Sequence, residues 1–153
     1  MIHDNTISVG AYDWDHAHWL GSFFPDDLPE DWRLSYYANE FTSVLVPEFK
    51  WRIENAELEQ WVEDTPPAFR FYFHNASGRP CDKPISVMGD KFAGFVLPDK
   101  NADVALLNYQ SKSLREWKDG LLNTELRAIF LTDERLTVTQ LSDFKSLIEF
   151  IGL

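Results

Sequence analysis

Short apolar runs rich in β-branched and aromatic residues alternate with segments of helix-forming composition along the chain, and this alternation constrains the fold more than any other feature. Strands are predicted over residues 6–12, 41–47, 69–75, 92–98 and 126–133. Helices are predicted over residues 30–41, 54–64, 102–122 and 138–151, and the clearest loop is predicted over 76–84. Because strands that alternate with helices build βαβ units, we expect a mostly parallel sheet of about four to five units.

The length of the chain limits how such units can be arranged. A complete eight-stranded α/β barrel takes about 250 residues, and this chain has 153. We therefore expect one α/β domain over residues 1–153, built as an open sheet or as a partial (half) barrel completed by a second chain. Because a half barrel leaves sheet edges or an apolar mouth exposed, a homodimer or a dedicated protein partner is predicted.

The last helix carries the most complete set of sequence signals. Thr137 and Gln140 have the spacing of a capping box, which predicts that the helix begins next to Thr137. Six apolar residues then recur at helical spacing: Val138, Leu141, Phe144, Leu147, Ile148 and Ile151. They predict one face packed against the core.

The acidic charge is confined to the first part of the chain. The net charge is −11; residues 1–66 hold 14 Asp and Glu against Arg33, Lys50 and Arg52, whereas residues 67–153 hold 11 of each sign. A nucleic-acid footprint would be a basic stripe, and an anionic membrane also selects basic surfaces. We therefore expect neither nucleic acid nor a membrane as a partner.

Few cofactor or compartment signals are found. Cys81 is the single cysteine, so no intramolecular disulfide forms. The start of the chain lacks a basic segment followed by an apolar run, and a cytoplasmic protein is expected. The glycines do not form a dinucleotide-binding or phosphate-binding motif, so no cofactor is predicted.

The stretch from Gly10 to Pro25 concentrates aromatic and titratable residues after the first predicted strand. Asp13, Asp15, His16 and His18 offer carboxylates and imidazoles of the kind that hold zinc or iron. The alternative, which we favour, is a polar loop beside an aromatic turn. Tyr12 and Trp14 are candidates for a ligand platform, because parallel sheets bind ligands at the carboxyl ends of their strands. Trp19, Phe23 and Phe24 are interpreted as packing residues.

Two further candidates follow other predicted strands. Glu48 comes after the second strand and His74 ends the third, so both are expected near the same mouth. A Glu/His pair within hydrogen-bond reach can perform general acid–base chemistry, although solvated loop residues are the commoner interpretation, which we favour. Asp133, after the strand at 126–133, is a third mouth residue, although a solvated or helix-capping role is commoner for such an Asp.

Aromatic, glycine and proline residues in a fixed order resemble the YecE-like family, a family of unknown function with a TIM-like barrel. The resemblance covers residues 7–74 and rests on Gly10, Trp14, Trp19, Gly21, Phe23, Phe24, Pro25, Tyr36, Tyr37, Ala38, Phe41, Trp61, Thr65, Pro66, Phe69 and Phe71. It implies a fold that corresponds to the first half of such a barrel. Residues 85–153 cannot be aligned with the family in this way.

The positions that depart from the family pattern bear on function. Where the resemblance implies a Glu and an Asn at the end of the second strand, the chain has Leu45 and Pro47, and His74 stands where a Lys is usual. Polar mouth residues are replaced while framework aromatics remain. This favours a non-catalytic binding or regulatory module with an aromatic-lined pocket for a small molecule at the strand ends. The alternative is a small metal-dependent hydrolase or lyase that uses the Asp/His cluster.

Overall fold

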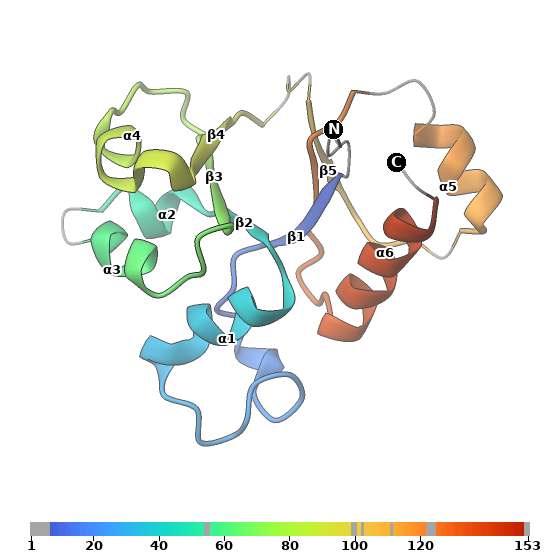
Figure 1. Cartoon of the computed structure of the whole chain (residues 1–153), viewed down its shortest axis with the longest axis horizontal. Coiled ribbons are helices and arrows are strands. Elements are labelled where there is room, and N and C mark those ends of the chain that lie inside the picture. Colours follow the sequence, from blue (N-terminus) through green and yellow to red (C-terminus); the bar gives the residue numbers. More distant parts are fainter. Residues whose placement is uncertain are drawn as a thin grey trace.

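The structure, a computed structural model, describes residues 7–53, 56–98, 101, 103–110, 112–121 and 125–151. In this part of the chain six strands form one curled, fully parallel sheet, seen almost end-on in Figure 1. The strands are β1 (Ser8–Tyr12), β2 (Ser43–Val46), β3 (Arg70–His74), β4 (Phe92–Val96), β5 (Val104–Leu107) and β6 (Ala128–Leu131). The predicted α/β fold with a parallel half barrel is confirmed.

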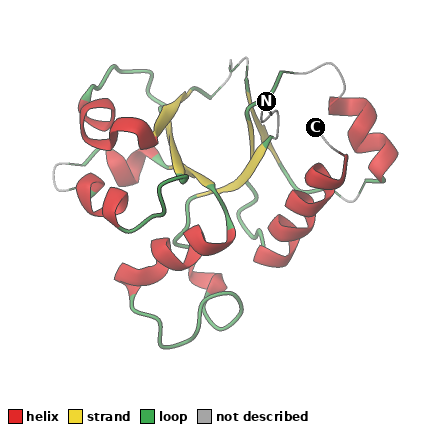
Figure 2. Ribbon diagram, in the orientation of Figure 1, coloured by secondary structure: helices red, strands yellow, loops and turns green. Residues whose placement is uncertain are grey.

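Helices lie on the outer, convex side of the sheet (Figure 2). They are α1 (Arg33–Glu40), α2 (Glu48–Trp51), α3 (Leu58–Glu63), α4 (Lys83–Met88), α5 (Leu114–Leu121) and α6 (Val138–Ile151), with short 3-10 helices η1 (Ala17–Trp19), η2 (Glu30–Trp32) and η3 (Gly89–Lys91). Within the described ranges no helix is long and apolar enough to cross a membrane.

The strand order is β4-β3-β2-β1-β6-β5, so β1 pairs with both β2 and β6. In a closed α/β barrel the last strand likewise returns to pair with the first. The half barrel is therefore not a run of consecutive strands: β1 to β4 lie in sequence, and β6 and β5 are added on the other side of β1. β4 and β5 are its two edge strands.

Strand β5 corrects the prediction of a helix over residues 102–122. Val104 to Leu107 form a strand, and among the described residues of that range only Leu114 to Leu121 are helical. Ala and Leu favour helices by a fraction of 1 kcal/mol per residue, so packing easily overrides this preference. Here Val104 and Leu106 pack with Phe130 inside the curled sheet.

The ends of two other predicted segments also differ. The predicted loop over 76–84 ends earlier than expected, because α4 begins at Lys83 with Pro84 in its first turn. Proline is tolerated there because the first turn has no use for its missing N–H group. The helix predicted over 54–64 is α3, which begins at Leu58; residues 54 and 55 lie outside the described part.

Side chains fill both faces of the sheet. The larger core, between sheet and helices, contains fully buried aromatic residues such as Trp19, Trp51 and Phe73. The concave interior holds a second cluster: Leu45, Tyr72, Val96, Val104, Ala128 and Phe130. The Tyr72 and Phe130 rings meet across it with centroids 5.0 Å apart. Because side chains fill the interior, a ligand could bind at the strand ends or on the outer surface but not inside the curled sheet.

Two contacts hold β1 tightly against β2. The buried hydroxyl of Tyr37 accepts a hydrogen bond from the Ala11 amide at 3.0 Å and donates one to the Ser43 carbonyl at 2.7 Å. At Gly10, a Cβ atom would lie 2.4 Å from the same Ser43 oxygen. Glycine at this position therefore allows the two strands to approach.

The predicted cap and the predicted buried face of α6 are both confirmed. The Thr137 hydroxyl accepts from the Gln140 amide, and the Gln140 side chain accepts from the Thr137 amide, both at 3.1 Å. Leu141, Phe144 and Ile148 are buried, and the other three predicted residues of this face pack beside the core.

Candidate functional site

Tyr12 and His74 end β1 and β3 on the inner face of the sheet. Residues two apart on a strand share a face, so His74 follows Tyr72 on the concave side, and Tyr12 packs against the inner cluster directly. The Tyr12 and His74 rings meet edge to face, with centroids 5.5 Å apart and planes at 88°. Both side chains are half-buried. Together they form a corner at the carboxyl end of the sheet.

The polar tips of this pair are available to a ligand. In the ranges that the structure covers, neither the Tyr12 hydroxyl nor the His74 imidazole makes a hydrogen bond to the protein. Burial raises the pKa of Tyr12, and the nearby charges of Asp13 and Glu48 raise it further. Burial lowers the pKa of His74 below its ordinary value, with Glu48 opposing. Both groups are therefore neutral near pH 7.

Thr132 and Asn108 continue the same edge, each directly after its strand, β6 and β5. Ala11 pairs with Leu131, so Thr132 follows beside Tyr12 on the neighbouring strand. The Thr132 hydroxyl lies 3.1 Å from Asn108 Oδ1. These two residues, but neither Tyr12 nor His74, line a hollow of about 450 Å³ at the ends of β5 and β6. An imidazole, a phenol, a hydroxyl and an amide thus lie at the ends of β3, β1, β6 and β5, and we call these four residues the mouth.

Sequence reasoning missed half of the mouth. Asn108 fell within a segment predicted to be helical, so it could not be placed at a strand end. Thr132 lay inside a predicted strand, next to the candidate Asp133. Alternation along the strand from Phe130, once that residue is known to face inward, would have identified Thr132. Asp133 instead accepts a hydrogen bond from the Tyr109 amide at 2.8 Å.

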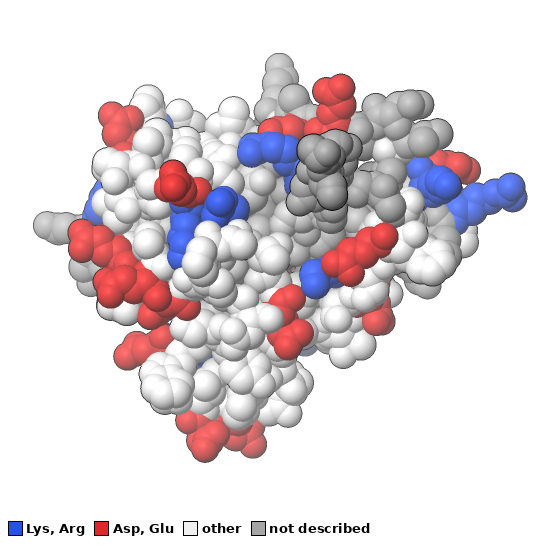
Figure 3. Space-filling view, in the orientation of Figure 1, with Lys and Arg blue, Asp and Glu red and all other residues white. Residues whose placement is uncertain are grey.

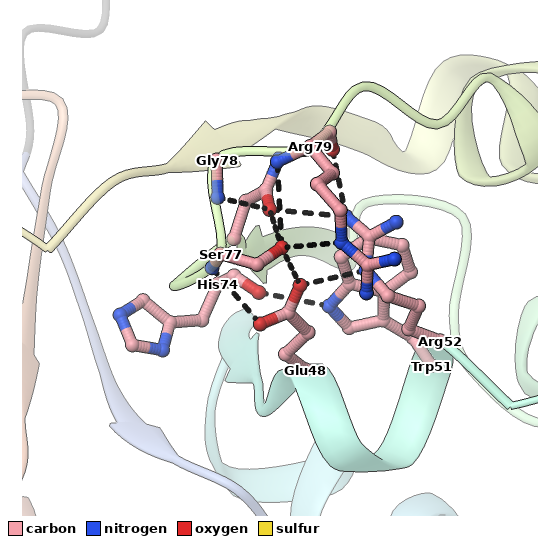
Figure 4. A network of polar contacts seen from close by, with 8 residues as sticks. Glu48, Trp51, Arg52, His74, Ser77, Gly78 and Arg79 are labelled. Atoms are coloured by element: carbon pink, nitrogen blue, oxygen red, sulfur yellow. Dashed lines mark hydrogen bonds and ion pairs between the residues drawn. The ribbon is translucent and has the colours of Figure 1, made fainter.

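Glu48 lies near the mouth but is held in a separate polar network (Figure 4). Its carboxylate accepts from the Ser77 hydroxyl at 2.7 Å and from Arg52 Nε at 2.6 Å. Arg52 also donates to Asn75 Oδ1 at 3.0 Å. The bond from Ser77, with a smaller contribution from Arg52, lowers the pKa of Glu48. The His74 ring points away from this network (Figure 4), so the two residues do not form an acid–base pair in this arrangement.

Asp13 and Trp14 are built into the turn after β1. Asp13 has a backbone φ of +70°, a conformation that Asp tolerates because its side chain can bond locally. Its Oδ1 accepts from the Trp14 amide at 2.7 Å and lies 3.0 Å from the Lys50 ammonium. Lys50 also sits 4.3 Å above the Trp14 ring, and Trp14 is 5% exposed. Arg33 pairs with the neighbouring Asp15.

His16 and His18 bond to backbone carbonyls. His16 Nε2 donates to the Tyr12 oxygen at 2.9 Å, and His18 Nε2 donates to the Leu136 oxygen at 2.6 Å. Burial lowers the pKa of His16, although Asp13 opposes the shift. Across the described residues no three His, Cys, Asp or Glu side chains come together as metal ligands. The predicted Asp/His cluster is therefore divided among separate contacts.

The seven candidate residues fall into three pairs and one separate residue in space. Tyr12 and His74 meet at the mouth; Asp13 and Trp14 share the contact with Lys50; His16 and His18 brace the following turn, with ring centroids 5.5 Å apart. Glu48 belongs to the network of Ser77 and Arg52. Of these seven, the Tyr12–His74 pair alone combines convergence with free polar tips in the described part of the chain.

Comparison with known proteins supports the resemblance to the YecE-like family. Residues 8–78 match the model of the DUF72 family, described as a protein family of unknown function. The fold is similar to that of a DUF72 family protein from Thermotoga maritima, with a TM-score of 0.62 and 11% sequence identity; the match covers 94% of this chain and 99% of that chain. No curated protein matches the chain.

Proposed function

We propose that this YecE-like chain, which matches the DUF72 family over residues 8–78, is a non-catalytic module that binds a small, neutral, ring-shaped molecule at its mouth. The perpendicular contact between Tyr12 and His74, with both polar tips free among the described residues, carries this proposal. Two rings at a right angle offer a face and an edge to a third ring, which are the two geometries that aromatic groups prefer. The mouth also lies where parallel sheets place ligands.

The chemistry of the mouth indicates what kind of ligand it takes. Its four side chains are neutral hydrogen-bonding groups that can donate and accept. Glu48 and Asp13, the charged groups near Tyr12, are paired with Arg52 and Lys50. The hollow beside Thr132 and Asn108 is also lined by Asp133, Glu134 and Arg135, whose charges of both signs partly offset one another. A ligand with hydroxyl or amide groups would find partners here, whereas an ion would find no counter-charge on Tyr12, His74, Thr132 or Asn108. We therefore infer a neutral polar ligand.

Binding without turnover fits the residues around the mouth better than catalysis. Leu45 and Pro47 occupy the places where the family resemblance implies a Glu and an Asn, and Leu45 is fully buried in the inner cluster. General acid–base chemistry needs an acid and a base within hydrogen-bond reach of the substrate. Glu48 is the carboxylate that the sequence offered for the general acid or base, and it already accepts hydrogen bonds from Ser77 and Arg52.

Native mass spectrometry of the purified protein tests this function. We expect a fraction of the protein to retain a small molecule, and the double variant Tyr12→Ala/His74→Ala to lose it. The control His18→Ala removes an imidazole of the same type from an exposed position outside the mouth and should retain the ligand. An adduct retained equally by the double variant, or a loss equally caused by the control, would contradict the proposal.

A homodimer remains part of the proposal. β4 and β5 end the sheet without pairing with each other, and unpaired strand edges are sites where another chain can add. The same mass spectrum reports the assembly, for which we expect twice the mass of one chain. A protein that stays monomeric at micromolar concentration would contradict the dimer and would leave the ligand test unaffected.

A further inference from the structure

A groove on the outer surface is separate from the mouth. It has a volume of about 1180 Å³ and runs between η2 and the start of α1 on one side and α3 and α4 on the other. Trp14 and Trp61, whose ring centroids are 5.0 Å apart, form its floor. Neither Tyr12 nor His74 lines it. A site here would be independent of the ligand proposed above.

Large apolar side chains are exposed in this groove. Trp32, on η2, is 64% exposed, and Ile53, which follows α2, is 47% exposed. Most other tryptophans described here are nearly fully buried. Exposed apolar side chains that gather in a hollow, with polar residues around them, are typical of a surface that binds another protein.

The walls of the groove carry an excess of negative charge. Six carboxylates line them, and across the described residues none forms an ion pair: Glu30, Asp31, Glu57, Glu59, Glu63 and Asp64. Two lysines also line the groove: Lys50 is paired with Asp13, whereas Lys83 forms no ion pair among the described residues, so the carboxylates remain in clear excess. Figure 3 shows acidic side chains gathered over α3. A cleft lined by one sign of charge concentrates its field and attracts the opposite sign.

We propose that this groove docks a basic segment of a partner protein, in which Arg or Lys side chains alternate with apolar ones. The cations would meet the carboxylates of the walls, and the apolar residues would cover Trp32 and Ile53. The groove already contains one cation–π contact, in which the Lys50 ammonium lies 4.3 Å from the Trp14 ring. An arginine of the partner over the exposed ring of Trp32 would repeat this interaction.

Size and charge favour a protein segment over two other occupants. A volume of about 1180 Å³ exceeds the range of roughly 300–1,000 Å³ that is usual for small-molecule pockets. A second copy of this chain would bring a net charge of −11 toward the acidic walls. Like charges facing each other oppose such an association.

Fluorescence anisotropy with a labelled ten-residue peptide of alternating Arg and Leu tests the proposal. The wild-type protein should bind this peptide and should not bind the corresponding Glu/Leu peptide. Glu59→Lys/Glu63→Lys should weaken binding by about tenfold or more, because two attractive charges become repulsive. Trp32→Ala should weaken it by about fivefold through the loss of the cation–π and apolar contacts.

The matched control is Asp119→Lys/Asp143→Lys. It makes the same change in net charge on exposed positions of α5 and α6, which lie across the molecule from α3 in Figure 1. Binding by this variant should stay within about twofold of the wild type. Equal weakening by the control would overturn the proposal, since net charge alone would explain binding. Absence of peptide binding, or full competition by an equal concentration of the small cation spermine, would also overturn it.

Discussion

The Tyr12 and His74 rings contact each other although β2 separates the strands that carry them, with ring centroids 5.5 Å apart. Strands that are not neighbours in a sheet lie about 9 to 10 Å apart when the sheet is flat. The curl of this sheet points the inner side chains of β1 and β3 toward each other. The mouth is therefore a product of sheet curvature, and changes that loosen the pairing of β1 should disturb it.

Gly10→Ala should destabilise the protein by about 3 kcal/mol or more, because the new Cβ atom would lie 2.4 Å from the Ser43 carbonyl oxygen. Gly120→Ala is the matched control. It makes the same change at an exposed position of α5 with no atom within 4 Å, and should raise stability by up to about 1 kcal/mol. Urea unfolding measures both. A Gly10→Ala variant as stable as the wild type would contradict the close packing of β1 on β2.

Tyr37→Phe should cost about 1 to 3 kcal/mol of unfolding free energy. The substitution leaves the Ala11 amide and the Ser43 carbonyl, both buried, without the hydroxyl that links them. Tyr36→Phe removes a hydroxyl from the adjacent residue, which makes no such bridge, and should change stability by less than about 0.5 kcal/mol. Equal effects of the two variants in urea unfolding would show that the bridge contributes nothing.

Thr137→Ala should cost about 1 kcal/mol, because it removes the acceptor for the Gln140 amide at the start of α6. Thr139→Ala makes the same change two residues later, at an exposed helical position. It should be neutral or slightly stabilising, since Ala has the higher helix propensity. Thermal unfolding of the two variants compares them, and a larger loss for Thr139→Ala would contradict the observed cap.

The stability of the protein should fall as the pH falls from about 7 to about 5.5. Burial lowers the pKa of His74 and of His16 in the folded state, so the unfolded chain takes up these protons first. Acid therefore favours the unfolded state, and the stabilisation is complete above the ordinary histidine pKa of 6.5. His74→Asn should reduce this loss of stability, because it removes one of the two histidines that take up a proton more readily in the unfolded chain. Urea unfolding at both pH values provides the test, and a loss as large in His74→Asn as in the wild type would contradict it.

The strands that could be predicted from the sequence are those whose residues favour a strand locally. The β-branched and aromatic runs of β2 and β3 are examples. β5 could not be predicted, because Ala105 and Leu106 suit a helix and become a strand only through packing beside β6. The same limit applies to the sheet order, which depends on β6 returning to β1.

The candidate site was predictable to a similar extent. Tyr12 and His74 each end a predicted strand, and the rule that ligands bind at strand ends selects both. The ion pair of Asp13 could not be predicted from this rule, because its partner Lys50 belongs to a helix far along the chain. For the same reason, the sequence left a metal site open as the less favoured interpretation of the run of Asp and His residues, and the folded chain distributes these residues among different partners.

The most direct test of the central claim is the NMR spectrum of the histidine and tyrosine rings during titration with neutral ring compounds that carry hydroxyl or amide groups. We predict that such compounds shift the His74 and Tyr12 ring signals and leave those of His18 in place. Charged analogues of equal size should cause smaller shifts. Two results would contradict the claim that the mouth is a ligand site. The ring signals of Tyr12 and His74 would stay in place with every compound, or the ring signals of all histidines would shift alike.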